Sequence, residues 1–156
     1  MTLNSNSNDG QDVTPANENQ APFAPHAVQT FADAGDRKRL TAVAVKAVTR
    51  LAQSWDLKNP EAAALLGVST STWERMKRGT RDNELSQDQL TRASALIGIY
   101  KALHLIFADQ MADRWPHLKN NGPLFNHNTP VEAMIDGGIP HMLDVRRLLD
   151  AVRGGM

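Results

Sequence analysis

Residues 69–81 combine hydroxyl and basic side chains in one short stretch of this sequence. The cations in this stretch have no acidic residue between them, which suits the phosphate backbone of a nucleic acid. The hydroxyl groups that precede the cations can contact phosphates or the edges of bases. The residues that we assign to DNA binding are Ser69, Thr70, Ser71, Arg75, Lys77, Arg78 and Arg81.

The elements that must position these side chains are typical of a helix-turn-helix. Asn59 can cap a first helix that ends at Leu66, because asparagine is a favoured N-cap residue. Gly67 can adopt a positive φ at the turn, and Ser69 can cap a second helix over residues 70–78. Small and large apolar residues would let the two helices cross closely. These residues are Ala62, Ala63, Leu66, Trp73 and Met76.

A helical bundle without a DNA-binding role could also contain two helices joined by a glycine turn. The agreement of cap, turn, apolar contacts and basic face within one segment favours the helix-turn-helix interpretation. The net charge of zero does not oppose it, because the charges are unevenly distributed. Residues 1–36 contain five acidic residues and no lysine or arginine, so the rest of the chain has a net charge of +5.

Residues 1–35 are predicted to form a disordered tail. The segment is rich in Asn, Ser, Gln and Pro and has few large apolar residues, so it would bury too little surface to offset its ordering entropy. It lacks the basic start and apolar core of a secretion signal, and no later apolar run is long enough to cross a bilayer. We therefore expect a protein of the cytoplasm.

The sequence shows no catalytic or metal-binding pattern. The chain has no cysteine, and its five histidines lack metal-ligand spacing. His104 lies in a helical apolar pattern, so we expect it in the core or at an interface. Nucleophile-elbow, Walker and dinucleotide-binding motifs are absent, as are convincingly paired carboxylates. We expect no enzyme activity, no cofactor and no metal.

The rest of the chain is predicted to be helical, which makes the fold all-α. Apolar residues at helical spacing predict an amphipathic helix over residues 36–55. Ser86 and Gln89 form a capping box at the start of a long helix that is apolar on more than one side, so we expect this helix to bridge two halves. Trp115 stops the next helix, and residues 118–128 form a loop.

A second capping box and two glycines divide the C-terminal part of the chain. Thr129 and Glu132 form the box at the start of a short helix, which is expected to end at Gly137 and Gly138. A last helix would begin near Pro140.

Residues of this C-terminal part resemble the toxin-binding domain of Xre/MbcA/ParS-type antitoxins. The residues that carry the resemblance are Trp115, Phe125, Thr129, Pro130, Met134, Gly137, Val145, Leu149, Asp150 and Arg153. The segment over residues 61–79 resembles the Xre-like helix-turn-helix of the same proteins. Beyond the tail at residues 1–35, the resemblance implies a DNA-binding domain at residues 36–97 and a toxin-binding domain at residues 98–156.

The resemblance implies an antitoxin that binds a cognate RES-domain toxin, an enzyme that consumes NAD or transfers from it. The antitoxin would block the toxin's active site with its C-terminal end and would repress its own operon as a homodimer on operator DNA. The implied toxin-binding residues are Trp115, Leu148, Leu149, Arg153, Gly154, Gly155 and Met156. Three alternatives remain. The C-terminal residues could be a frayed end. The protein could also be a free-standing regulator whose C-terminal module only dimerises, or an enzyme in its own right, which the missing catalytic pattern disfavours.

Overall fold

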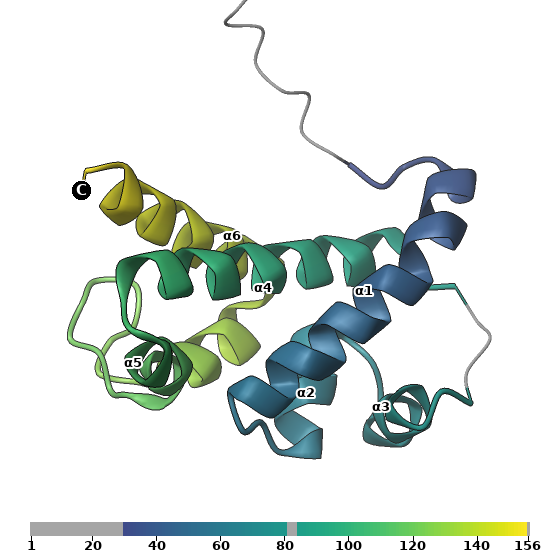
Figure 1. Ribbon diagram of the computed structural model, residues 1–156, viewed down its shortest axis with the longest axis horizontal. Helices are drawn as coiled ribbons and strands as arrows, with labels where there is room; N and C mark the ends of the chain where they lie inside the picture. Colours follow the sequence, from purple (N-terminus) through teal and green to yellow (C-terminus); the bar gives the residue numbers. More distant parts are fainter. Residues whose placement is uncertain (1–29, 81–83, 156) are drawn as a thin grey trace, which may run out of the picture.

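The computed structural model describes residues 30–80 and 84–155, and every regular element in these ranges is a helix. Figure 1 shows α4 running through the middle of the molecule, with α1 and α3 toward one end and α5 and the C-terminal end of α6 at the other. The all-α prediction is confirmed for the described residues. The elements are α1 (Ala34–Ser54), α2 (Asn59–Leu66), α3 (Thr70–Lys77), α4 (Gln87–Ile106), α5 (Asp109–Arg114), a 3₁₀ helix η1 (Trp115–His117) and α6 (Pro130–Gly154).

Helix α1 begins two residues earlier than the sequence predicts. Asp33 is its N-cap, and the Asp33 carboxylate accepts a hydrogen bond of 2.8 Å from the Asp36 amide. Phe31 lies before the helix and is only 8% exposed, because it packs in the same core cluster as Ala44 and Leu90. Phe31 and the start of α1 thus lie within residues 30–35, which the sequence interpretation assigns to the tail. Residues 1–29 of that tail lie outside the described residues.

The start and the apolar face of α1 also differ in detail from the prediction. Arg37 donates hydrogen bonds to the carbonyls of Phe31 and Ala32, at 3.0 and 2.7 Å. Arg39 pairs with Asp36 at 2.9 Å. Both arginines thus hold the chain around the first turn of α1. Val43 fits the helical apolar spacing but is 64% exposed.

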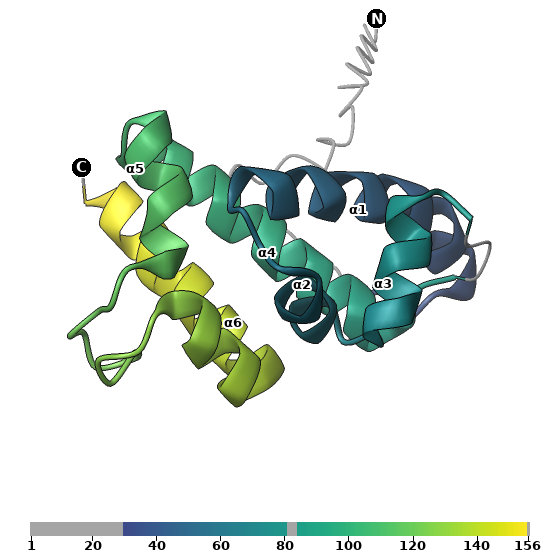
Figure 2. The same cartoon turned by 90° about the horizontal axis from the view of Figure 1, so that it is seen from below.

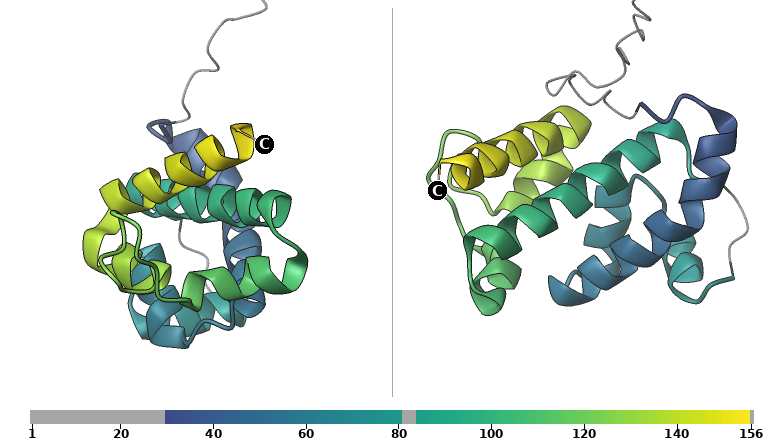
Figure 3. Two further views of the ribbon diagram at one scale, coloured as in Figure 1. Left: turned by 90° about the vertical axis from the view of Figure 1, so that its left-hand side faces the viewer. Right: turned by 45° about the horizontal axis from the view of Figure 1, so that its top comes forward.

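Two hydrophobic clusters form the core, and α4 contributes to both of them. Leu90 and Ala93, near the start of α4, pack with residues of α1, α2 and α3. Residues from Ala95 onward pack with α6, with Phe125 and with the end of α1. Figures 2 and 3 show the same arrangement, with α4 between the two groups of helices. The prediction that this long helix bridges two halves is confirmed.

Helix α6 is broken at Gly138, where the sequence predicts the end of one helix before the start of another. Gly138 has φ 65° and ψ −153°, which interrupts the helical backbone. The helix begins with the predicted capping box, in which the Thr129 hydroxyl accepts from the Glu132 amide and the Glu132 carboxylate accepts from the Thr129 amide, both at 3.1 Å. The break redirects the C-terminal part of α6 along α4.

Candidate functional site

The first helix of the helix-turn-helix has a different cap from the predicted one. Lys58 is the N-cap of α2, and its amide donates a hydrogen bond of 2.9 Å to the Glu61 carboxylate. Asn59, the predicted cap, is already helical. Its side-chain oxygen accepts a hydrogen bond of 3.0 Å from the Lys77 ammonium. Asn59 therefore ties the start of α2 to the end of α3 instead of capping a helix.

The turn between α2 and α3 has the predicted geometry. Gly67 has φ 77° and ψ 37°, a left-handed conformation that glycine adopts without a steric penalty. The Gly67 amide donates to the Ala63 carbonyl at 2.9 Å. Ser69 is the N-cap of α3, and its hydroxyl accepts a hydrogen bond of 3.1 Å from the Thr72 amide. These local interactions fix the angle at which α3 leaves the turn.

The apolar side of α3 anchors the helix against α2. Trp73 is 1% exposed and Met76 is also buried. Both belong to one cluster with the buried residues Ala62, Ala63 and Leu66 of α2. The predicted core of the motif is confirmed, and α3 presents its opposite side to solvent.

That opposite side of α3 carries the residues assigned to DNA binding. The Arg75 guanidinium donates to the Thr72 hydroxyl at 3.2 Å, so Arg75 lies along the helix surface. Arg81 lies outside the described residues. The assigned residues found exposed are Ser69, Thr70, Ser71, Arg75, Lys77 and Arg78.

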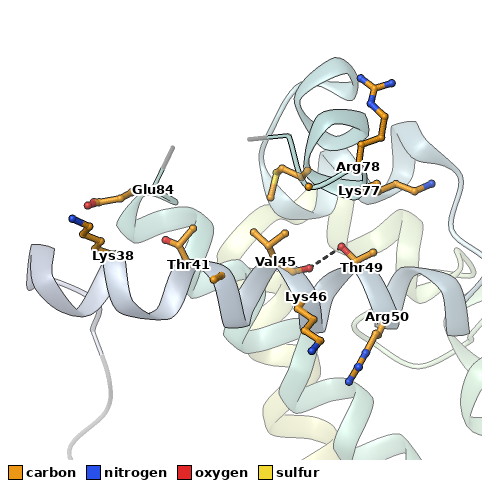
Figure 4. Close-up of a pocket in the computed structure, with 12 residues that line it drawn as sticks. Lys38, Thr41, Val45, Lys46, Thr49, Arg50, Lys77, Arg78 and Glu84 are labelled. Atoms are coloured by element: carbon orange, nitrogen blue, oxygen red, sulfur yellow. Dashed lines mark hydrogen bonds between the residues drawn. The ribbon is translucent and has the colours of Figure 1, made fainter. Parts of the chain in front are cut away.

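The structure adds basic residues of α1 that the sequence interpretation missed. A cleft of about 820 Å³ lies between α1 and α3, and its lining includes Lys46 and Arg50 of α1 together with Lys77 of α3 and Arg78, which directly follows α3 (Figure 4). Lys38 also lines the cleft. The three α1 cations are separated by four or eight residues, a spacing that places them on one side of a helix. They are Lys38, Lys46 and Arg50. That spacing is the sequence signal that could have identified them.

The residues assigned to toxin binding divide into a buried and an exposed group. Leu149 is 4% exposed and belongs to the core, so it cannot contact a partner directly while the core is intact. Trp115 is half-buried, and its ring meets Phe125 edge-on with 5.7 Å between centroids. Leu148 is 38% exposed. Arg153, Gly154 and Gly155 are exposed at the end of α6, and Met156 lies outside the described residues.

A polar cluster that the sequence did not predict joins α4 to α5. The two ring nitrogens of His104 lie 3.0 Å from a carboxylate oxygen of Asp109 and 2.9 Å from one of Asp113. The His104 ring also lies against Tyr100, with 4.3 Å between centroids. Burial alone would lower the pKa of His104, but hydrogen bonds and charge from Asp109 and Asp113 outweigh it and the net pKa is raised.

Two further structural features bear on the kind of protein this is. Among the described residues, no group of three His, Cys, Asp or Glu side chains could hold a metal ion. No helix in the described ranges is long and apolar enough to span a bilayer.

Comparisons with known proteins agree with this arrangement. Residues 34–98 match the family model of the antitoxin Xre-like helix-turn-helix domain. The uncharacterized protein y4oB of Sinorhizobium fredii (strain NBRC 101917 / NGR234) is 31% identical over 113 residues, which cover 71% of this chain and 84% of that protein. A chain in the crystal structure of the M. tuberculosis MbcT–MbcA toxin–antitoxin complex has a similar fold, with a TM-score of 0.50 and 20% identity over 73% of this chain and 96% of that chain.

Proposed function

The chain belongs to the Xre-type antitoxin family, and from this premise we propose that it neutralises a cognate RES-domain toxin in the cytoplasm and represses its own operon. In this proposal the toxin carries out the NAD chemistry. The antitoxin itself has no enzyme activity and needs no cofactor. One observation carries the proposal: the exposed face of α3 and the C-terminal end of α6 lie at opposite ends of the molecule (Figures 1 and 2). One chain can therefore hold DNA and a protein partner at the same time.

The DNA-binding part of the proposal rests on α3. Its assigned residues are exposed, and Trp73 and Met76 fix the helix on the opposite side. A helix of eight residues covers only one half-site of an operator. We therefore propose that a homodimer binds a palindromic promoter, with one α3 in each half-site.

The toxin-binding part of the proposal rests on the end of α6. The buried Leu149 holds the helix against the core, and the exposed Leu148 and Val152 present apolar surface one turn apart. Beyond them, residues 153–156 combine a cation with two glycines, whose lack of a side chain lets the backbone enter a narrow cleft. We propose that this end enters the toxin's NAD pocket.

Truncation separates toxin binding from toxin inhibition. A chain that lacks residues 153–156 should still copurify with the co-expressed cognate toxin, because buried anchors supply most of the binding energy of an interface. Cells that express this pair should lose NAD and stop growing, whereas cells with the full chain should be protected. Arg147→Ala is a matched control, because it removes another exposed cation of α6. Cells that express this variant with the toxin should keep their NAD and continue to grow. Full protection by the truncated chain would refute the plug at the NAD pocket.

A free-standing regulator is the second candidate function. The exposed pair Leu148 and Val152 also fits a surface by which the C-terminal helices of two copies meet. Co-expression distinguishes the two candidates, since a regulator of this kind would purify as a dimer without any toxin and would leave toxin activity unchanged. Recovery of a stable complex with the cognate toxin would exclude it.

A further inference from the structure

The cleft between α1 and α3 has an apolar floor. Figure 4 shows Thr41, Val45 and Thr49 extending from α1 toward α3, where Met76 lines the opposite wall. The Thr41 hydroxyl donates to the Arg37 carbonyl at 2.6 Å and accepts from the Leu85 amide at 3.1 Å. The Thr49 hydroxyl donates to the Val45 carbonyl at 2.8 Å. Both hydroxyls already have backbone partners, so the floor offers methyl and methylene groups to an occupant.

The edge of the same cleft is cationic. Lys38, Lys46, Arg50, Lys77 and Arg78 border it, against the single carboxylate of Glu84. Within residues 30–80 and 84–155, no carboxylate lies within ion-pair distance of these five cations. Phosphate alone would match the edge but not the floor. The cleft therefore fits an acidic chain that also carries apolar side chains.

We propose that residues 1–29 of this same chain occupy the cleft. They hold three carboxylates, at Asp9, Asp12 and Glu18, and no lysine or arginine. They also supply apolar side chains, among them Val13 and Phe23. The carboxylates meet the cationic edge while the apolar side chains cover the floor.

The connection between this segment and the cleft makes occupation within one molecule favourable. Residue 30 precedes α1, which forms one wall of the cleft. The distance along α1 from its first residue to Lys46 is about 18 Å, at 1.5 Å per helical residue. A chain of this length can reach about 95 Å when extended. Tethering also gives the segment an effective concentration on the order of millimolar, so weak contacts suffice.

Occupation of the cleft has a consequence for nucleic-acid binding. Lys77 and Arg78 belong both to the cleft and to the exposed face of α3. The acidic segment therefore competes with phosphate for the same two cations. Because the contact lies within one chain, it can be tested without DNA and without a toxin, so its failure is distinct from any failure of the proposed function.

A spin label on the segment tests the contact directly. The chain has no cysteine, so Ala16→Cys gives a single site for a nitroxide label. In the NMR spectrum of the full-length labelled chain, the amide signals of Thr41, Val45 and Met76 should lose most of their intensity. Those of Asp144 and Arg147 on α6 should keep theirs. If the signals of all surface amides lost intensity to the same extent, the proposal would be overturned.

Charge variants identify the forces that hold the segment. The double variant Lys46→Glu/Arg50→Glu should restore the cleft signals, whereas Lys101→Glu/Lys119→Glu, which changes two exposed lysines outside the cleft, should not. A triple change within the segment, Asp9→Asn/Asp12→Asn/Glu18→Gln, should also restore them and leaves every described helix untouched. Unchanged signal loss in that triple variant would overturn the proposal. A further experiment mixes chains that carry only the spin label with chains that carry only the NMR isotope. If the cleft signals were lost only in this mixture, the proposal would be overturned and the cleft would be assigned to a second copy of the chain.

Discussion

The helix-turn-helix and the C-terminal helices differ in the range of the contacts that define them. In the helix-turn-helix, the polar contacts that begin its two helices join residues three apart, Lys58 with Glu61 and Ser69 with Thr72. In the C-terminal part, Arg146 of α6 donates to the Ser94 carbonyl of α4, 52 residues away. Local contacts are visible in a sequence, whereas distant ones depend on the fold. The first region can therefore be interpreted residue by residue, whereas in the second the sequence indicates helix ends and apolar faces but not the contacts between helices.

The same contrast appears in how glycine is used. Gly67 serves a local purpose, since its positive φ makes the turn between two consecutive helices. Gly98 serves a distant one, because a Cβ there would lie 2.5 Å from Nε of Arg146. Its missing side chain lets Arg146 lie across α4. Nothing in the sequence around Gly98 indicates that purpose.

Substitution of Trp73 is expected to have the largest effect on stability, and it tests whether the helix-turn-helix depends on its own small core. Trp73→Ala should lower the free energy of unfolding by about 3–5 kcal/mol, because a nearly fully buried large side chain is lost. Trp73→Phe should cost less, since it keeps an aromatic ring and removes an indole N–H that has no hydrogen-bond partner in the structure. Urea denaturation followed by circular dichroism measures both. Equal stability of Trp73→Ala and the unmodified chain would show that α3 is not held by this cluster.

Glycine substitution separates backbone strain from packing in the same motif. Gly67→Val should destabilise by about 1–3 kcal/mol, because a β-branched residue is strained at positive φ. The Cβ would also meet the Arg92 side chain at 3.1 Å. Gly79→Val is the matched control, since Gly79 also has a positive φ but has nothing within 4 Å of its Cβ position. A smaller loss at Gly79 would assign the difference to Arg92, and an equal loss would assign the whole effect to strain.

Removing cations tests whether the two ends of the molecule have separate functions. Arg75→Ala and Arg78→Ala should each weaken operator binding by about 1–3 kcal/mol if they contact bases. Both side chains are exposed, so the helical circular dichroism should be preserved. Arg147→Ala at the other end should bind DNA normally. Gel shifts that do not change for the double variant would remove α3 from the DNA interface.

The sequence predicted most of the fold because its helices carry their own start and stop signals. The capping boxes at Ser86 and Thr129 and the break at Gly138 were all identifiable from residue type. Two of the errors came from contacts between elements. Asn59 has the right type for a cap, yet Lys77 of α3 engages its side chain. Phe31 lies in a polar stretch, yet the core buries it.

The candidate sites were less predictable than the fold for the same reason. Single residues of α3 could be assigned because the helix-turn-helix defines its exposed face locally. The cleft needs α1 and α3 side by side, and the His104 cluster needs the turn that brings α5 back against α4. Leu149 lies on the apolar side of its predicted helix, where a residue can face either a partner or the core. The structure shows that it is buried in the core cluster that contains Ala95 and Phe125.

A pH titration tests whether the polar cluster at His104 stabilises the C-terminal part. The pKa of His104 is raised in the folded chain, so its stabilising contribution is complete below the ordinary value of about 6.5. The contribution is lost as the pH rises through the folded pKa. His104→Gln should therefore reduce stability most at acidic pH, with a difference that shrinks as the pH rises through the folded pKa. Asp113→Asn should lower the His104 pKa in an NMR titration more than Asp109→Asn, since the Asp109 side chain is 90% exposed.

Deletion of residues 1–29 is expected to have the smallest effect on stability, and it tests where the helix-turn-helix region begins. Deletion of residues 1–29 should change the unfolding free energy by no more than about 0.5 kcal/mol in high salt, where surface charge contacts are screened. The deletion keeps Thr30, whose carbonyl accepts a hydrogen bond of 2.9 Å from Gln87. It also keeps Phe31, which is buried. Phe31→Ala in the full chain is the contrasting variant and should lower the melting temperature clearly. If the deletion proved as costly as Phe31→Ala, residues 1–29 would have to share the core of α1, and the boundary between the two kinds of contact would move toward the N-terminus.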